Sequence, residues 1–126
     1  MNKQRKYWGW GYDQKKIESK VLKKTISFLC QALNIEEKVS QFPRPVEEIT
    51  LRAPRFELDE TTKDICSQDK FHRLSHSYGK SYNDIVLGLR GEFPNPPDYV
   101  AFPKDESELQ KLIMFAEANT ISLTPY

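Results

Sequence analysis

Prolines set the strongest limit on how this chain can fold. Eight occur in 126 residues, and they lie in the segments 43–54 and 94–103 and at position 125. Proline has no backbone N–H, and it also disfavours a helical conformation in the residue before it. We therefore expect regular structure between these segments, and an extended connector lying across a surface from about 41 to 60.

The composition predicts a loop-rich chain with a small core. Hydrophobic residues make up 38% of the sequence and charged residues 29%, so the apolar share is below that of an ordinary globular domain. The net charge of +1 gives no overall attraction to nucleic acid or to an anionic membrane. No run approaches the roughly 18 apolar residues that a membrane span needs.

Cysteine usage predicts a reduced, cytoplasmic setting without a disulfide. The two cysteines, Cys30 and Cys66, have no metal-ligand spacing, and no secretory signal follows the basic N-terminus. Cys30 falls in an apolar helical run, so we expect it to be a small buried hydrophobe.

The first amphipathic helix is predicted between residues 18 and 33, where apolar residues recur at helical spacing and Asn34 can cap the C-terminal end. Its opposite face carries lysines, which we interpret as a solvated surface. Asp59 or Thr61 could begin a second, short helix that runs through Ile65.

Two further helices have clear start signals. Ser81 is followed three residues later by Asp84, and Asp105 is followed by Glu108, which is the spacing of an N-terminal capping box. Gly91 is well placed to end the first of these two helices.

The C-terminal part reads as a strand–helix–strand unit. A short apolar strand is predicted at 99–102, a helix from about 105 to 118, and a second strand from Ile121. So short a connection between strands indicates a right-handed parallel crossover. In such units the ligand binds at the carboxyl ends of the strands, and here the second strand ends at Pro125 and Tyr126.

Three motifs resemble a known flavoprotein family. They are WGWGY at 8–12, RLSHSYGKSYNDIVLGLRGEFPNPPD at 73–98 and PPDYVAFPKDESELQKLIMFAEANTISLTPY at 96–126. Their order and spacing resemble the vanillyl-alcohol-oxidase (PCMH-type) flavoprotein superfamily. Within it, they are most similar to the alkyl-dihydroxyacetone-phosphate synthase group of FAD-linked oxidases.

This resemblance implies an α+β fold in two parts. Residues 1–92 would be a helical and extended leader, and residues 93–126 would be the first βαβ unit of a PCMH-type FAD-binding domain. In the family a glycine-rich segment that cradles the FAD pyrophosphate follows at once, so Pro125 and Tyr126 are the implied cofactor-binding residues. The resemblance places the catalytic residues beyond Tyr126, and none is assigned here.

The chain therefore looks like the truncated N-terminal part of an FAD-dependent oxidoreductase. By itself it is expected to be inactive, not to bind FAD tightly, and to have an aggregation-prone C-terminal third. One chain of a split flavoenzyme, completed by a separate remainder-of-enzyme chain, is an alternative. Membrane association of a peripheral kind is known in the resembled group, and attachment through the basic helix face stays open.

The alternative from another functional class is a small stand-alone binding module. It would bind a partner through the basic aromatic segment KQRKYWGWGY. Aromatic rings interleaved with cations are typical of single-strand nucleic-acid platforms. Large aromatics near a terminus are also common packing anchors, and we favour packing, without a nucleic-acid partner.

Other catalytic or metal readings are not favoured by the sequence. His72 and His76 have the i, i+4 spacing of a zinc pair, but no third ligand has a companion spacing, and Gly79 argues against a firm helix. We predict no metal site. The serines around His76 lack a nucleophile elbow, and the Gly79–Lys80–Ser81 run lacks the upstream glycine of a phosphate loop, because position 74 is leucine.

Overall fold

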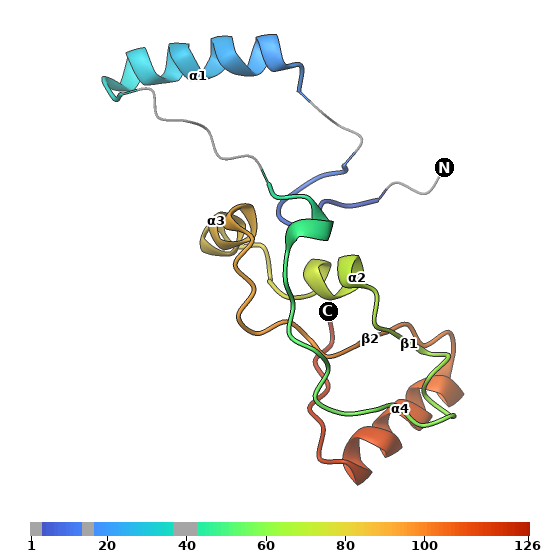
Figure 1. Cartoon of the computed structure of the whole chain (residues 1–126). Helices are drawn as coiled ribbons and strands as arrows, with labels where there is room; N and C mark the ends of the chain where they lie inside the picture. Colours follow the sequence, from blue (N-terminus) through green and yellow to red (C-terminus); the bar gives the residue numbers. More distant parts are fainter. Residues whose placement is uncertain (1–3, 14–16, 37–42) are drawn as a thin grey trace.

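The computed structural model describes residues 4–13, 17–36 and 43–126. The order of elements is α1 (Ser19–Leu33), the 3₁₀ turn η1 (Val46–Glu48), β1 (Cys66–Ser67), α2 (Lys70–Ser75), α3 (Tyr82–Arg90), β2 (Val100–Ala101) and α4 (Glu106–Ala118). Figure 1 shows α2, α3 and the strands grouped in one body, with α4 at one end and α1 apart from the others.

The helix caps follow the sequence pattern. In α3 the Ser81 hydroxyl accepts from the Asp84 N–H, the Asp84 carboxylate accepts from the Ser81 N–H, and Gly91 ends the helix with φ of 73°. Asp105 caps α4 by accepting from the N–H of Glu108. The Glu108 carboxylate accepts in return from the N–H of Lys104.

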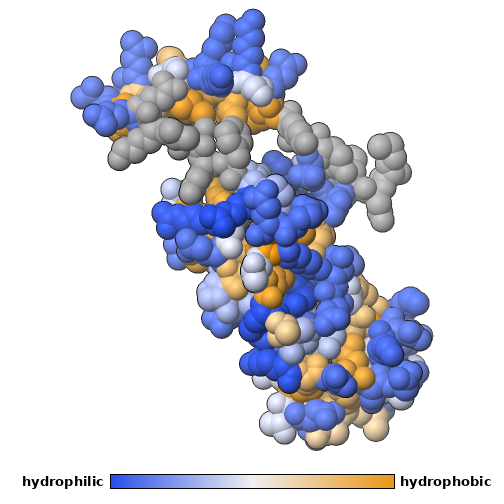
Figure 2. Space-filling model, viewed as in Figure 1, coloured by the Kyte–Doolittle hydropathy of each residue, from blue (hydrophilic) through white to orange (hydrophobic). Residues whose placement is uncertain are grey.

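Helix α1 forms where it was predicted, and Asn34 takes the left-handed cap conformation. None of its residues is buried. Its hydrophobic residues gather along one side and its charged residues along the other (Figure 2). The prediction that Cys30 is buried is wrong, because α1 leaves this thiol only half-covered.

The core lies between α2, the 46–51 segment and the N-terminal aromatic segment. Four buried side chains form its centre: Tyr7, Ile49, Leu74 and Phe93. Leu74 is fully buried, which explains why α2 forms although the sequence argued against a helix there. Burial of its apolar side outweighs the weak local signal.

The only sheet among the described residues has two antiparallel strands. Cys66 pairs with Ala101 and Ser67 with Val100, and the N–H of Phe102 donates to the carbonyl of Ile65 at 2.9 Å. The first predicted strand is thus present, with an antiparallel partner. The short helix predicted to end at Ile65 is instead a series of turns.

The second strand of the predicted parallel crossover is not confirmed. Residues 121–126 follow α4 in extended form without ladder pairing, and the partner of β2 comes from the 66–67 segment. Alternation of apolar and polar residues favours a strand only where a neighbouring strand supplies hydrogen bonds. Here the segment is held through the Tyr126 side chain instead, as described below.

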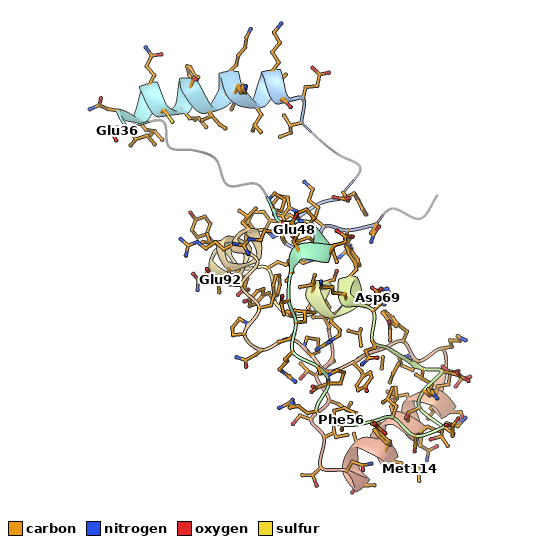
Figure 3. All side chains as sticks on the ribbon, viewed as in Figure 1. Glu36, Glu48, Phe56, Asp69, Glu92 and Met114 are labelled. Carbon is orange, nitrogen blue, oxygen red and sulfur yellow. The ribbon has the colours of Figure 1, made fainter. Side chains whose placement is uncertain are left out.

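One face of α4 packs on the connector, and the other is open. Leu112 and Ala116 are buried, and the Phe56 ring lies 6.3 Å from that of Phe115. Figure 3 shows Phe56 beside α4 and Met114 on the same helix. Met114 is 62% exposed and Ile113 48%, so much of the apolar surface of this helix has no cover among the described residues.

Candidate functional site

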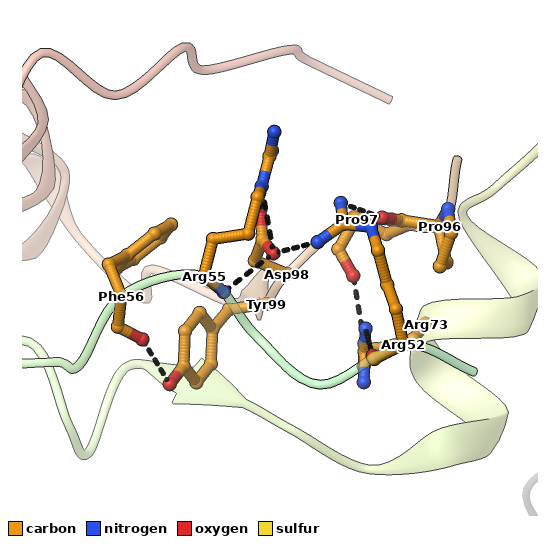
Figure 4. A network of polar contacts seen from close by, with 8 residues as sticks. All are labelled: Arg52, Arg55, Phe56, Arg73, Pro96, Pro97, Asp98 and Tyr99. Atoms are coloured by element: carbon orange, nitrogen blue, oxygen red, sulfur yellow. Dashed lines mark hydrogen bonds and ion pairs between the residues drawn. The ribbon is translucent and has the colours of Figure 1, made fainter. Parts of the chain in front are cut away.

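Asp98 is the centre of the best-defined polar site. Its side chain is 7% exposed and accepts from two arginines of the proline-rich connector (Figure 4). Arg55 donates through Nη2 at 2.7 Å, through Nε at 3.1 Å and through its backbone N–H at 3.1 Å. Arg52 donates through Nη1 at 2.5 Å. Nε and Nη2 of the Arg55 guanidinium both donate to Oδ2 of Asp98, and these are charge-assisted hydrogen bonds.

A third arginine joins the same segments through backbone carbonyls. Arg73 of α2 is 5% exposed, and it donates to the carbonyl of Pro97 at 2.8 Å and to that of Arg52 at 2.7 Å. Tyr99 adds a bond from its hydroxyl to the carbonyl of Phe56 at 3.0 Å. Together these bonds hold the connector, α2 and the start of β2 against one another.

Electrostatics stabilise the ionised form of Asp98. Burial alone would raise its pKa, but the hydrogen bonds from Arg55 and Arg52 outweigh burial and lower the pKa to about 2. For Arg73, burial and then the charge of Arg52 lower the pKa of the guanidinium. A carboxylate paired in this way is ionised at neutral pH and accepts hydrogen bonds only. We assign the site a structural role, since no proton-transfer partner adjoins it among the described residues.

Asp98 meets arginines more than forty positions away along the chain, and the sequence did not predict this network. The available signal was a lone acid after two prolines, together with two arginines in the LRAPRF segment. Such a signal indicates an ion pair but not which acid and which arginine meet.

The two implied cofactor-binding residues lie at the end of the extended 121–126 segment. Pro125 is exposed. Tyr126 donates from its hydroxyl to the carbonyls of Ser75 and Tyr78, each at 3.0 Å, and its ring lies 4.6 Å from that of His76. Burial raises the pKa of the Tyr126 phenol, so this residue is a neutral hydrogen-bond donor at physiological pH.

These two residues do not by themselves fit a dinucleotide pyrophosphate. Proline offers no N–H, and the Tyr126 hydroxyl is already bonded to the protein's own backbone. The five glycines of the sequence are at positions 9, 11, 79, 88 and 91, so the segment that ends at Tyr126 does not itself supply a glycine-rich backbone cradle for such a phosphate group. No step of a flavin reaction can therefore be assigned to residues of this chain.

The two histidines pack against an aromatic side chain rather than around a metal. The His72 and His76 rings lie 5.0 Å and 6.0 Å from that of Phe102, and His76 donates from Nδ1 to the carbonyl of His72 at 2.8 Å. In residues 4–13, 17–36 and 43–126 no group of three or more metal-ligating side chains occurs.

The serines are used in local structure. Ser77 donates to the carbonyl of Arg73 at 2.7 Å, and Ser81 caps α3. A serine outside the predicted set, Ser67, lies 2.8 Å from Nδ1 of His72 and also accepts from the N–H of Asp69. No carboxylate orients that histidine among the described contacts, so the arrangement lacks the third member of a catalytic triad.

The N-terminal aromatic segment divides its rings between packing and solvent. Tyr7 is buried, donates from its hydroxyl to the carbonyl of Arg44 and lies 6.2 Å from the Phe93 ring. Trp8 packs against the core and holds the Lys6 ammonium 4.8 Å from its ring centroid. Trp10 is 68% exposed. The packing role predicted for this segment agrees with the positions of Tyr7 and Trp8.

In the part of the chain that the structure describes, no helix combines the length and the apolar character needed to cross a bilayer.

The thiol of Cys66 is half-buried, and burial raises its pKa. Neither cysteine forms a disulfide.

Comparison with solved structures identifies the fold. A crystal structure of alkyldihydroxyacetonephosphate synthase in space group P1 matches 93% of this chain and 26% of that protein, with a TM-score of 0.68 at 21% sequence identity. A second crystal form of the same enzyme, in P212121, matches with a TM-score of 0.64 at 19% identity. The helices and small antiparallel sheet thus correspond to part of the alkyldihydroxyacetonephosphate synthase fold.

Sequence comparison gives the same answer. The alkyldihydroxyacetonephosphate synthase of Dictyostelium discoideum is 29% identical over 94 residues, and that of Trypanosoma brucei brucei is 30% identical over 96 residues. No protein-family model matches. By homology the chain falls in the FAD-linked oxidase class of proteins. Within that class it belongs to the alkyldihydroxyacetonephosphate synthase family, of which it corresponds to a fragment.

The extent of these matches is limited. They cover 75% of this chain but only 15% of each curated relative. What the relatives do as whole enzymes therefore enters here only as a proposal.

Proposed function

We propose that this chain acts as the structural N-terminal part of an FAD-dependent, alkyldihydroxyacetonephosphate-synthase-like flavoprotein. Residues 93–126 would begin the FAD-binding domain, and residues 1–92 would support it. In the complete assembly the 121–126 segment would pair as a strand, which would place Pro125 and Tyr126 beside the pyrophosphate. Bound FAD would supply the redox and adduct chemistry of such an enzyme.

The observation that carries this proposal is homology over three quarters of the chain to a small share of a much longer enzyme. The surface of the chain agrees with it. The accessible area is 10094 Å², whereas a compact monomer of 14.8 kDa exposes roughly 7000 Å². Surfaces such as the open side of α4 are therefore suited to burial against further protein.

The proposal also implies that the 126-residue chain does not catalyse turnover or hold FAD tightly. The Asp98 network would then serve to fix the leader to the first strand of the flavin domain. Arg52 and Arg55 donate to the Asp98 carboxylate and so join the connector to the start of β2. A role in fixing the leader to the first strand requires such a connection.

A chimera tests the proposal. The matching segment of the Dictyostelium enzyme is replaced by residues 1–126, and the purified protein is assayed for bound flavin by its yellow absorbance and for synthase activity. A deletion of the same segment is the control. We expect flavin in the chimera and little in the deletion. Stoichiometric flavin on the isolated 126-residue chain, or a folded chimera without flavin, would contradict the proposal.

A separate partner chain is the second candidate, because the exposed residues of α4, Leu109, Ile113 and Met114, could be covered by it as well as by the same polypeptide. Co-expression of residues 1–126 with the remaining part of the Dictyostelium enzyme tests this arrangement. A flavin-containing complex of two chains supports it. Purification of the two chains separately and without flavin contradicts it.

A further inference from the structure

The WGWGY segment folds into a returning loop that encloses a small open cavity. Arg5 and Tyr12 pair as an isolated antiparallel bridge, and the N–H of Lys6 donates to the carbonyl of Gly11 at 3.1 Å. The cavity measures about 220 Å³, and its lining consists of Arg5, Gly9, Trp10, Gly11, Tyr12 and Lys80. The 5–12 loop and Lys80, about seventy positions away along the chain, thus line the same pocket.

Two cations meet in this pocket. Lys80 is half-buried and donates to the carbonyl of Lys6 at 3.3 Å. Burial and then the charge of Arg5 lower the pKa of the Lys80 ammonium. Within the described ranges 4–13, 17–36 and 43–126, neither Arg5 nor Lys80 forms an ion pair. Asp84 lies four positions after Lys80 in the sequence, and its carboxylate accepts from the N–H of Ser81 at 2.9 Å.

The arrangement of this pocket has a conformational cost. Lys80 has φ of 63°, a left-handed conformation that non-glycine residues rarely adopt and that is enriched at functional sites. An ammonium has three donors, and one described acceptor contacts this one. Lys80 thus combines a strained backbone with a partly satisfied ammonium, and it lines the same pocket as Arg5.

Two glycines open the loop side of the pocket. A Cβ atom at Gly9 or Gly11 would meet nothing within 4 Å, and Gly11 has φ of 81°, which strongly favours glycine. The absence of side chains lets a ligand approach the backbone closely. The exposed indole of Trp10 supplies an apolar wall beside the charges.

We propose that this pocket binds a phosphate group through Arg5 and Lys80. Two cations that line one pocket favour a dianionic ligand over a single carboxylate, and the cavity has room for one phosphate with a small substituent. The group could belong to a small phosphomonoester or to the diphosphate of a nucleotide, which share this chemistry. The proposal goes beyond the flavoprotein function above and does not require bound FAD.

The test is a titration of the 126-residue chain followed by backbone amide NMR. Inorganic phosphate is the first probe, and glycerol phosphate and ADP then distinguish the two sources. Lys80→Asn removes the charge with a residue that tolerates positive φ, and Arg5→Gln removes the second charge. Lys111→Gln and Arg90→Gln change exposed cations on α4 and α3 and serve as matched controls.

We expect saturable shifts of the signals of residues 5–12 with phosphate, and affinity about tenfold weaker in Lys80→Asn and in Arg5→Gln. The two control variants should bind as the original chain does. Tighter binding of glycerol phosphate or of ADP identifies the source of the group. No saturable shift, or equal affinity in all five proteins, overturns the proposal, provided that far-UV circular dichroism shows each variant folded.

Discussion

Replacement of Asp98 by asparagine is the sharpest test of what holds this chain together. The carboxylate accepts from both arginines of the connector, and the substitution removes its charge while keeping its shape. The fall of its pKa from 3.8 to about 2 corresponds to about 2 kcal/mol of folding free energy at neutral pH. We therefore expect Asp98→Asn to lower the free energy of unfolding by about 2 kcal/mol.

The same reasoning fixes the pH dependence. The pKa of Asp98 is lower in the folded chain than in the unfolded chain, so the unfolded chain binds more protons between about pH 4 and pH 2. The stability that this group contributes is fully present above about pH 4, and it is lost as the pH falls toward 2. The difference between the original chain and Asp98→Asn should accordingly narrow as the pH falls through that range.

Urea unfolding followed by far-UV circular dichroism at pH 7 and at pH 3 measures both effects. Asp64→Asn is the matched control, because Asp64 is exposed, and it should change stability by less than about 0.5 kcal/mol. Arg55 is 72% exposed, so Arg55→Gln should cost less than Asp98→Asn. Equal stability of Asp98→Asn and Asp64→Asn at pH 7 would refute the assigned role of the network.

Two further substitutions test local packing and capping by the same unfolding measurement, and a third is tested by hydrogen exchange. Gly88→Ala would place a methyl group 3.2 Å from the Cα of Trp8, so we expect a net loss of about 1 kcal/mol, whereas Gly79→Ala meets only ordinary contacts and should be close to neutral. Ser81→Ala removes the cap of α3 and should cost about 1 kcal/mol, compared with a smaller change for the exposed Ser107→Ala. Tyr126→Phe loses the hydrogen bonds to two carbonyls and should speed hydrogen exchange near residue 126. Tyr82→Phe is the control, because its side chain is 80% exposed, and it should leave exchange there unchanged. An unchanged exchange rate in Tyr126→Phe would show that these bonds do not hold the segment.

Local signals account for what the sequence predicted well. The caps of α3 and α4 depend on residues three positions apart, so Ser81 with Asp84 and Asp105 with Glu108 could be recognised without knowledge of the fold. The end of α1 at Asn34 is of the same kind. Family membership also follows from sequence, because the three motifs keep their order along the chain.

Long-range contacts account for what the sequence missed. Helix α2 is short, and it forms because Leu74 is buried in the core and Arg73 bonds to distant carbonyls. The partner of β2 is Cys66–Ser67, for which the sequence predicted no strand, and the strand expected at 121 depends on neighbours that the sequence pattern does not specify. For the phosphate pocket, only the fold brings Lys80 to the aromatic segment.

The contacts around residue 93 bear on how the leader and the start of the flavin domain would work together. Phe93 shares a core with Tyr7 and Ile49, and Asp98 binds both arginines of the connector. The first strand therefore emerges from a framework made mostly by the preceding residues. Because a two-stranded sheet is only marginally stable by itself, this framework rather than the sheet would set the direction of β2 in the flavin domain that we propose.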